Sequence, residues 1–198
     1  MKIGLIRHGM TDWNVERRAQ GQTDIPLNET GRQQARALAN RLKDEKWGFI
    51  ISSHLSRAYE TASIIAKSLK IPVLTDNRLQ EKSFGNVEGT TIEERISTFG
   101  PDWHRVDFGE EDNAEVQKRS LQAVEDACQK YPNQNILFVS HGATMKQLIV
   151  GLLQDEQFDQ GFENTSISIF TGNVGKWECS LLNCAKHLSA LKTNSTIQ

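Results

Sequence analysis

The chain has 198 residues, of which 37% are hydrophobic and 24% are charged, and its formal net charge is −2. A chain of this length buries roughly 70% of the surface that it exposes when unfolded, so it forms a full core without disulfides. This composition excludes the collagen-like, disordered and disulfide-dense classes. The nearly neutral charge, without any basic run that carries interleaved aromatics, argues against nucleic acid as a partner.

Cysteine usage and hydropathy indicate the compartment. The three cysteines, Cys128, Cys179 and Cys184, form no CxxC pair and are odd in number, which is typical of reduced thiols. No apolar run approaches the about 20 residues of a membrane span. We therefore predict a cytoplasmic protein with no membrane partner, with a single domain over residues 1–198 and a loose tail from about residue 192.

Strands and helices alternate in the predicted secondary structure. Buried strands are expected at residues 3–6 and 49–51, a weak strand at 73–75, and the clearest strand at 136–139. A polar loop is expected after the first strand, as far as Pro26. Helices are expected from an N-cap at Asn28 to about Lys46, from Ser56 to before Pro72, over residues 92–99, after a cap at Asn113, and over residues 144–153.

This alternation predicts an α/β fold in three layers, with helices on both faces of a mostly parallel sheet. Residues 167–170 and 177–182 flank a Gly-Asn-Val-Gly turn, which predicts a hairpin at the sheet edge. The irregular segment at about 79–112 predicts a lid or a binding loop. In such sheets ligands bind beyond the carboxyl ends of the strands, so chemistry is expected there.

Arginine and histidine follow three of the predicted strand ends. Arg7 and His8 come directly after the first strand, Arg57 opens the helix after the second, and His141 follows the strand at 136–139. Because the carboxyl ends of parallel strands share one edge, we expect these cationic donors on one rim, where they suit a phosphoryl group. Each residue alone is ambiguous, since a His-Gly turn and an exposed arginine at a helix start are common structural features.

Other chemistries lack their residues. The motifs GxxxxGK[ST], GxGxxG and GxSxG are absent, which argues against nucleotide-dependent phosphoryl transfer, a dinucleotide cofactor and an α/β-hydrolase. His8 and His141 could ligate zinc, but two neighbouring guanidinium groups repel a dication and no HExxH spacing is present. The sequence therefore predicts no metal and no cofactor.

Four motifs occur in order between residue 3 and about residue 150. They are Leu5-Ile6-Arg7-His8-Gly9-Met10-Thr11 with Asn14, Gln20-Gly21 and Gly31; Ser53 to Ser56-Arg57-Ala58 with Glu60-Thr61-Ala62; Leu79-Gln80-Glu81 with Phe84-Gly85 and Glu88-Gly89; and Val139-Ser140-His141-Gly142. Together they resemble the histidine phosphatase superfamily, in its phosphoglycerate mutase-like branch and of the broad-specificity phosphatase type.

The resemblance implies a role for each matching residue. The implied catalytic residues are Arg7, His8, Arg57, Glu81 and His141. His8 is then the nucleophile that forms a phosphohistidine, while the two arginines and His141 hold the equatorial oxygens. Glu81 protonates the leaving oxygen and then deprotonates the attacking water. The implied substrate-binding residues are Arg7, Asn14, Gln20, Gly21, Arg57, Glu81, His141 and Gly142.

Glu81 has to carry a proton before it can donate one. Glu88 is the rival proton donor, and only geometry separates the two. Without its motif, Glu81 would by default be interpreted as a solvated loop carboxylate.

The chain departs from the family pattern at two places. Met10 stands where the family usually has Glu, at a position that we expect to point away from phosphorus. Residues 109–112 read Gly-Glu-Glu-Asp where the family often shows Gly-Glu-Ser. The acidic cluster at 110–112 either disfavours highly anionic substrates or is the solvated start of the helix at Asn113.

The stretch between Glu81 and His141 is shorter than in the cofactor-dependent mutases of the family, which favours water as the acceptor. The predicted function is a metal-independent phosphomonoesterase that acts on small phosphorylated metabolites, as a monomer or homodimer. The alternatives are a cofactor-dependent phosphoglycerate mutase and a non-catalytic phosphate-binding module. Phe99, Trp103 and Phe108 are either walls for the organic part of the substrate or packing residues of the lid.

Overall fold

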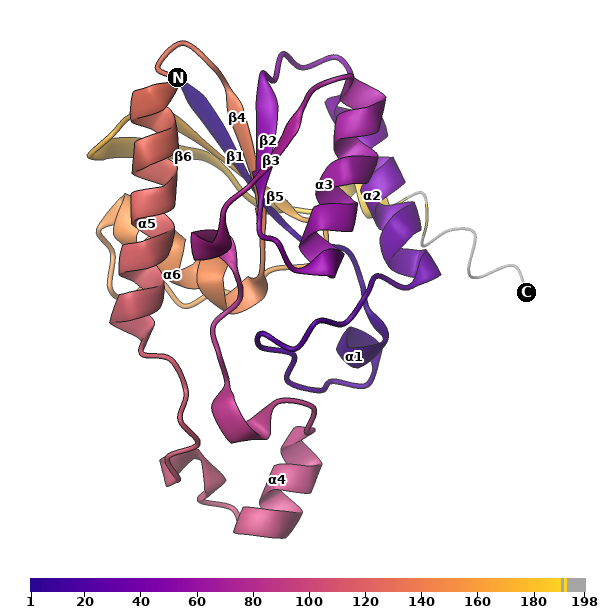
Figure 1. Ribbon diagram of the computed structural model, residues 1–198, viewed down its shortest axis with the longest axis vertical. Coiled ribbons are helices and arrows are strands. Elements are labelled where there is room, and N and C mark those ends of the chain that lie inside the picture. Colours follow the sequence, from indigo (N-terminus) through magenta and orange to yellow (C-terminus); the bar gives the residue numbers. More distant parts are fainter. Residues whose placement is uncertain (190, 192–198) are drawn as a thin grey trace.

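The described residues form one six-stranded sheet in the order β3-β2-β4-β1-β5-β6 (Figure 1). Its strands are β1 (Lys2–Arg7), β2 (Phe49–Ser52), β3 (Val73–Thr75), β4 (Ile136–Ser140), β5 (Ile167–Asn173) and β6 (Lys176–Cys184). The helices are α1 (Asp12–Val15), α2 (Glu29–Leu42), α3 (Ser56–Leu69), α4 (Ile92–Phe99), α5 (Asn113–Lys130) and α6 (Gly142–Leu153), with short 3-10 helices at Asn77–Leu79, Gly85–Val87, Trp103–Arg105 and Lys186–Leu188. The computed structural model describes residues 1–189 and 191, so the tail predicted from about residue 192 lies outside the described residues.

Helices cover both faces of the sheet, α5 and α6 on one and α2 and α3 on the other (Figure 1). Consecutive residues of β4 point to opposite faces, so Phe138 packs among α5 and α6 while Leu137 and Val139 pack among α2 and α3. Strands β1 to β4 are parallel, whereas β5 pairs antiparallel with β1 and β6 antiparallel with β5. The predicted three-layer α/β fold, mostly parallel with an edge hairpin, is therefore confirmed.

Three local predictions were wrong. The polar loop after the first strand contains helix α1, where Thr11 and Asn14 form a reciprocal capping box that is too short to show apolar periodicity. Helix α2 ends at Leu42 rather than near Lys46, because no apolar residue follows it until Trp47. Helix α5 is capped by Asp112, whose side chain accepts from the backbone of the second helical residue, and not by the neighbouring Asn113.

No helix in the part of the chain that the structure describes is long and apolar enough to cross a membrane. All three cysteines are free thiols, with Cys128 and Cys184 buried and Cys179 exposed. Burial raises the pKa of Cys128 to about 11. This thiol therefore stays protonated, and unreactive, at neutral pH.

The loop after β1 rests directly on the first turn of α2. The backbone N–H of Asn28 donates to the Met10 carbonyl at 3.0 Å, and the Asn28 side chain accepts from the N–H of Gly31 at 2.9 Å. A Cβ at Gly31 would overlap the Met10 carbonyl oxygen, and one at Gly9 would lie 2.6 Å from the Gly31 carbonyl oxygen. Two glycines thus let the loop that carries His8 approach the helix backbone.

Replacing Gly31 with alanine is expected to lower the free energy of unfolding by about 1–3 kcal/mol, because the added methyl group overpacks this contact. The gain in helix propensity, about 0.5–1 kcal/mol, offsets only part of the loss. Each kcal/mol lowers the midpoint of thermal unfolding by roughly 2–4 °C in a chain of this size. Gly161→Ala is the control, since a Cβ there meets nothing within 4 Å. Equal midpoints of thermal unfolding for Gly31→Ala and Gly161→Ala would show that the loop adjusts to the added methyl group without a loss of stability.

Candidate active site

Two histidines meet where β1 and β4 end. The ring centroids of His8 and His141 lie 5.1 Å apart with the rings tilted by 55°. The backbone N–H of His8 donates to the Ser140 carbonyl at 2.9 Å, which continues the parallel pairing of the two strands by one more residue. Both imidazoles are buried, with 2% and 0% of their surface exposed. The sequence prediction that strand ends bring these side chains to one rim therefore holds in the structure.

The His8 imidazole has a fixed tautomer. Its Nδ1 lies 2.7 Å from the carbonyl oxygen of Gly9, and because a carbonyl oxygen only accepts, Nδ1 carries the proton. Burial, followed by the charges of Arg7 and Arg57, holds the pKa of His8 well below its ordinary value of 6.5. The ring is therefore neutral, with its lone pair on Nε2.

The backbone behind His8 is held by a turn that the sequence did not single out. The N–H of Thr165 donates to the carbonyls of Arg7 (3.0 Å) and His8 (3.2 Å), and the Asn164 side-chain amide donates to the His8 carbonyl at 3.1 Å. Thr165 is fully buried with a φ of 57°, a strained conformation for a β-branched residue. No motif marks these residues, because their contribution is a backbone geometry made far along the chain.

Two buried guanidinium groups flank the histidines. Arg57 is fully buried and donates to the carbonyls of Gly21 (2.7 Å) and Thr23 (2.9 Å), and Arg7 donates to the Phe162 carbonyl at 2.5 Å. The Nε atom of each arginine is buried and has no hydrogen-bond partner among the described residues. Burial lowers the pKa of both arginines. Such a donor set suits an anion, and no group of three or more His, Cys, Asp or Glu residues that could hold a metal occurs in residues 1–189 and 191.

His141 contributes a further nitrogen to the rim. Its Nε2 lies 2.9 Å from the hydroxyl of Ser53, and its Nδ1 is buried without a partner in the described structure. The Ser53 oxygen accepts from the N–H of Leu55 at 3.3 Å, so its own hydrogen can be donated to Nε2. Nδ1 then carries the proton of a neutral ring, because burial and neighbouring positive charge hold the pKa of His141 well below 6.5.

Glu81 is seated at the amino end of α6. One carboxylate oxygen accepts from the backbone N–H of Thr144 (2.9 Å), its hydroxyl (3.0 Å) and the N–H of Lys82 (2.9 Å), and the other accepts from the N–H of Ala143 at 3.2 Å. Glu81 also opposes the lowering of the pKa of Arg7 and Arg57, so its charge acts on the same cluster. The buried Glu81 thus joins the rim and is not a solvated loop residue.

Glu88 is hydrogen-bonded to the loop that follows α1 and to Phe84. It accepts from the N–H groups of Gln22 (3.0 Å), Thr23 (2.9 Å) and Phe84 (3.0 Å) and from the Thr23 hydroxyl (2.6 Å). Burial alone would raise the pKa of Glu88, but these hydrogen bonds outweigh it and hold the pKa below its ordinary value. Gly21 has a φ of 51° and packs against this carboxylate, so a Cβ there would overlap it. Glu88 is therefore ionised, and it holds in place the loop whose Gly21 and Thr23 carbonyls accept hydrogen bonds from Arg57.

The other predicted binding residues have mixed surroundings. The Oδ1 atom of Asn14 accepts from the Thr11 N–H (3.1 Å) and the Asn164 amide (3.2 Å), which leaves its Nδ2 group as the atom to face a substrate. The buried Gln20 accepts from the Thr11 hydroxyl at 3.0 Å. At Gly142, a Cβ would make ordinary van der Waals contact with Arg7, 3.5 Å from its Nε atom.

A cleft of about 400 Å³ lies between the α1 region and the 79–112 segment, which projects beyond the carboxyl ends of the parallel strands (Figure 1). Its lining includes Trp13, Asn14, Arg17, Phe84 and Trp103. Of the three aromatic walls considered from sequence, only Trp103 lines this cleft. The rings of Phe99 and Phe108 instead pack against each other, 5.0 Å between centroids.

Comparison with known proteins agrees with this geometry. Residues 3–185 match the model of the histidine phosphatase superfamily (branch 1). The chain is 35% identical over 189 residues to the uncharacterized phosphatase PhoE of Bacillus subtilis, covering 94% of this chain and 96% of that protein. Its fold is similar to that of Bacillus stearothermophilus YhfR, with a TM-score of 0.87, 30% identity and coverage of 95% and 99% of the two chains.

A further solved structure is a phosphoserine phosphatase from Entamoeba histolytica in complex with 3-phosphoglyceric acid. It has a TM-score of 0.80 and 36% identity to this chain, with coverage of 94% and 98%. Phosphatases among the relatives support a phosphatase activity, and they confirm the resemblance seen in the motifs. The chain belongs to the histidine phosphatase superfamily, branch 1.

Proposed function

We propose that the protein is a metal-independent phosphomonoesterase that hydrolyses small phosphorylated metabolites through a phosphohistidine at His8. The observation that carries the proposal is the neutral His8 ring, whose Nε2 lone pair is set by the hydrogen bond from Nδ1 to the Gly9 carbonyl. Beside it, Arg7 and Arg57 each keep a buried Nε without a partner in the described chain. A nucleophile and an anion site therefore lie together.

The first step forms the phosphoenzyme. His8 Nε2 attacks phosphorus as the bond from phosphorus to the ester oxygen breaks, and Glu81 gives its proton to the leaving oxygen. Arg7 and Arg57 stabilise the charge on the equatorial oxygens. Since these donors are already fixed by the protein, little reorganisation is needed as charge develops.

The second step returns the enzyme to its starting state. The Glu81 carboxylate takes a proton from a water molecule, whose oxygen attacks the phosphorus of the phosphohistidine. The bond from nitrogen to phosphorus breaks, inorganic phosphate leaves, and His8 Nε2 regains its lone pair. His141 and the arginines hold the same oxygens in both steps, so one anion site serves the whole cycle.

We infer the substrate class from the cleft at the α1 region, whose lining includes the predicted binding residue Asn14 but none of the five proposed catalytic residues. Trp13 and Trp103 contribute aromatic surface to the lining, with the Arg95 guanidinium 4.6 Å from the centre of the Trp103 ring, and Arg17 contributes a further cation. A small organic phosphate fits a space of about 400 Å³. Hydrolysis, and not transfer back to a phosphoglycerate, is supported by the short stretch between Glu81 and His141. The names of the relatives do not separate the two reactions, because some are named phosphatases and others, at 34% identity, are named phosphoglycerate mutase-like or probable phosphoglycerate mutases.

Phosphate release in EDTA tests the proposal, on a panel of monoesters that includes phosphoserine and 3-phosphoglycerate. Wild type is expected to release phosphate, and His8→Ala to lose activity about a thousandfold or more because no covalent intermediate forms. Trapping a phosphoenzyme in acid-quenched wild type, absent from His8→Ala, identifies the nucleophile. Interconversion of phosphoglycerates without phosphate release would indicate a mutase, and phosphate binding without turnover would indicate a binding module.

Glu81→Gln is expected to lower kcat about 10²–10⁴-fold, the usual contribution of a positioned general acid or base. Glu88→Gln is the matched variant and is expected to lower kcat by roughly tenfold or less, because an ionised anchor gives up no proton. Rates are compared on one alkyl phosphate, with thermal midpoints measured for both. A larger loss for Glu88→Gln, with both variants folded, would reverse the assignment of the donor.

The ionisation of His8 predicts a particular titration. Burial and two arginines disfavour the imidazolium cation, so the pKa moves down and protonation requires a lower pH than 6.5. At pH 6 an ordinary histidine is mostly protonated, but His8 is expected to stay neutral with its proton on Nδ1. Nitrogen-15 NMR of labelled histidine reports both properties. Titration near pH 6.5, or a proton on Nε2, would contradict the proposed nucleophile.

A further inference from the structure

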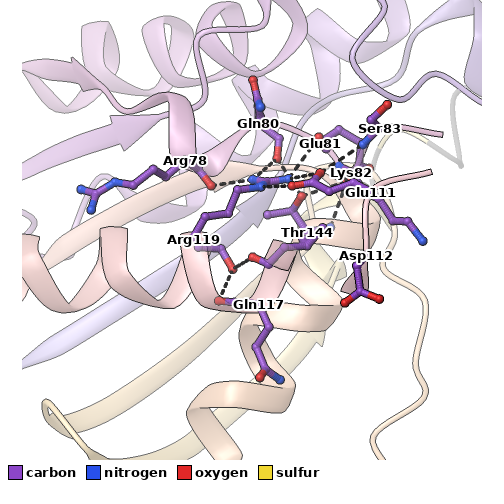
Figure 2. Close-up of polar contacts among 12 residues, drawn as sticks. Arg78, Gln80, Glu81, Lys82, Ser83, Glu111, Asp112, Gln117, Arg119 and Thr144 are labelled. Carbon is purple, nitrogen blue, oxygen red and sulfur yellow. Dashed lines mark hydrogen bonds and ion pairs between the residues drawn. The ribbon is translucent and has the colours of Figure 1, made fainter. Parts of the chain in front are cut away.

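Arg119 on α5 holds the main chain that leads to Glu81. Its guanidinium donates to the backbone carbonyls of Arg78 (2.6 Å), Gln80 (2.8 Å) and Glu81 (3.2 Å) (Figure 2). The remaining donors bind both carboxylate oxygens of Glu111, at 2.7 and 2.9 Å. These hydrogen bonds of the planar guanidinium therefore go to the main chain of residues 78–81 and to the Glu111 carboxylate.

Glu111 also holds this segment, through two hydrogen bonds with the backbone of Ser83. Its carboxylate accepts from the backbone N–H of Ser83 at 3.2 Å, and its own N–H donates to the Ser83 carbonyl at 3.0 Å. A second ion pair joins Lys82 to Glu110 at 3.0 Å. Residues 78–83 are thus held by Arg119 and Glu111, as Figure 2 shows, and by the ion pair of Lys82 with Glu110.

These contacts bear on both hypotheses for the acidic cluster at residues 110–112. Glu110 and Glu111 are engaged in ion pairs, and Asp112 caps α5. The Glu111 carboxylate faces Arg119 and the Ser83 backbone, so its charge is compensated within the protein. Neither hypothesis describes Glu111: its charge is neutralised by Arg119, so it does not repel an anionic substrate, and its side chain is not a solvated helix start.

The two supports of Glu81 act on different atoms. The amino end of α6 holds the carboxylate, through Ala143 and Thr144, while Arg119 holds the carbonyl oxygen of the same residue. The Thr144 hydroxyl and Arg119 also share the Gln80 carbonyl, which the hydroxyl meets at 2.8 Å. The position of the carboxyl group is therefore fixed at both ends, although Arg119 donates to no side-chain atom of Glu81.

We propose that Arg119 and Glu111 are positioning residues that fix Glu81 for proton transfer to the leaving oxygen and from the attacking water. This inference rests on the proposed function. A partly exposed ion pair contributes only about 0–1 kcal/mol to stability. In contrast, a displacement of an acid by about 1 Å costs on the order of a hundredfold in rate.

The test compares two phosphate esters in Arg119→Lys and Glu111→Gln. An alkyl phosphate such as glycerol 1-phosphate needs a proton on its leaving oxygen, whereas 2,4-dinitrophenyl phosphate releases a stable anion without one. We expect kcat/KM to fall about tenfold or more on the alkyl ester and less than about threefold on the aryl ester. Because the second step still needs Glu81 as a base, the aryl ester is also expected to give a burst of dinitrophenolate.

The controls are Lys118→Gln and Glu115→Gln, which change the charge of exposed neighbours on the same helix. Both are expected to match wild type on the two esters. Thermal midpoints are measured for every variant, and Glu111→Gln carries the test where Arg119→Lys does not fold. Equal losses on both esters, or no loss on either, would overturn the positioning role.

Glu81→Gln, measured in parallel, separates this inference from the proposed function. It is expected to show the same preference for the aryl ester, in a stronger form. If Glu81→Gln discriminates between the esters and the Arg119 and Glu111 variants do not, the positioning role fails while the proposed function stands. If wild type forms no phosphoenzyme with either ester, the proposed function fails and the positioning role fails with it.

Discussion

The burial of two arginine cations beside a neutral histidine is the constraint on which the rest of the site depends. A buried charge is costly unless hydrogen bonds replace its water, and here main-chain carbonyls do so, at Gly21 and Thr23 for Arg57 and at Phe162 for Arg7. Those carbonyls come from loops at opposite ends of the sequence. Each loop must therefore hold its shape for the cations to stay in place, and loop structure becomes part of the electrostatics of the site.

Much of this arrangement could be predicted from sequence, because it depends on the ends of regular elements. Apolar strands that stop at Arg7 and His141 place these residues on one edge, whatever the loops do. The supports could not be predicted in the same way. Thr165 acts through a backbone N–H and a strained φ, and Arg119 acts through main-chain carbonyls, so neither leaves a pattern of side-chain types in the sequence. The missed helix α1 has the same cause, since a single capped turn carries no periodicity.

The surroundings of three carboxylates give them three different functions within one region of the fold. Glu88 receives three backbone N–H groups and a hydroxyl, and becomes a fixed anchor of the 21–23 loop. Glu111 receives a guanidinium and stays compensated. Glu81 lies at the amino end of α6, the helix end nearest the histidines. Of these three carboxylates, only Glu81 has a charge that acts to raise the pKa of Arg7. All three residues are glutamates, so the difference between them comes from the hydrogen-bond donors and charges around each carboxylate.

The proposed catalytic residues and the proposed substrate cleft lie on different parts of the structure. The proposed nucleophile and anion site are held by the sheet and by loops that pack on α2, and Glu81 is held by α5 and α6. The cleft that we propose for the organic group is instead lined by the α1 region and by the 79–112 segment, which lies beyond the strand ends. Substitutions at Trp13 or Trp103 can therefore reshape the cleft while the donors around phosphorus keep their geometry. This separation explains how one phosphoryl-transfer site can serve relatives that act on different phosphorylated molecules.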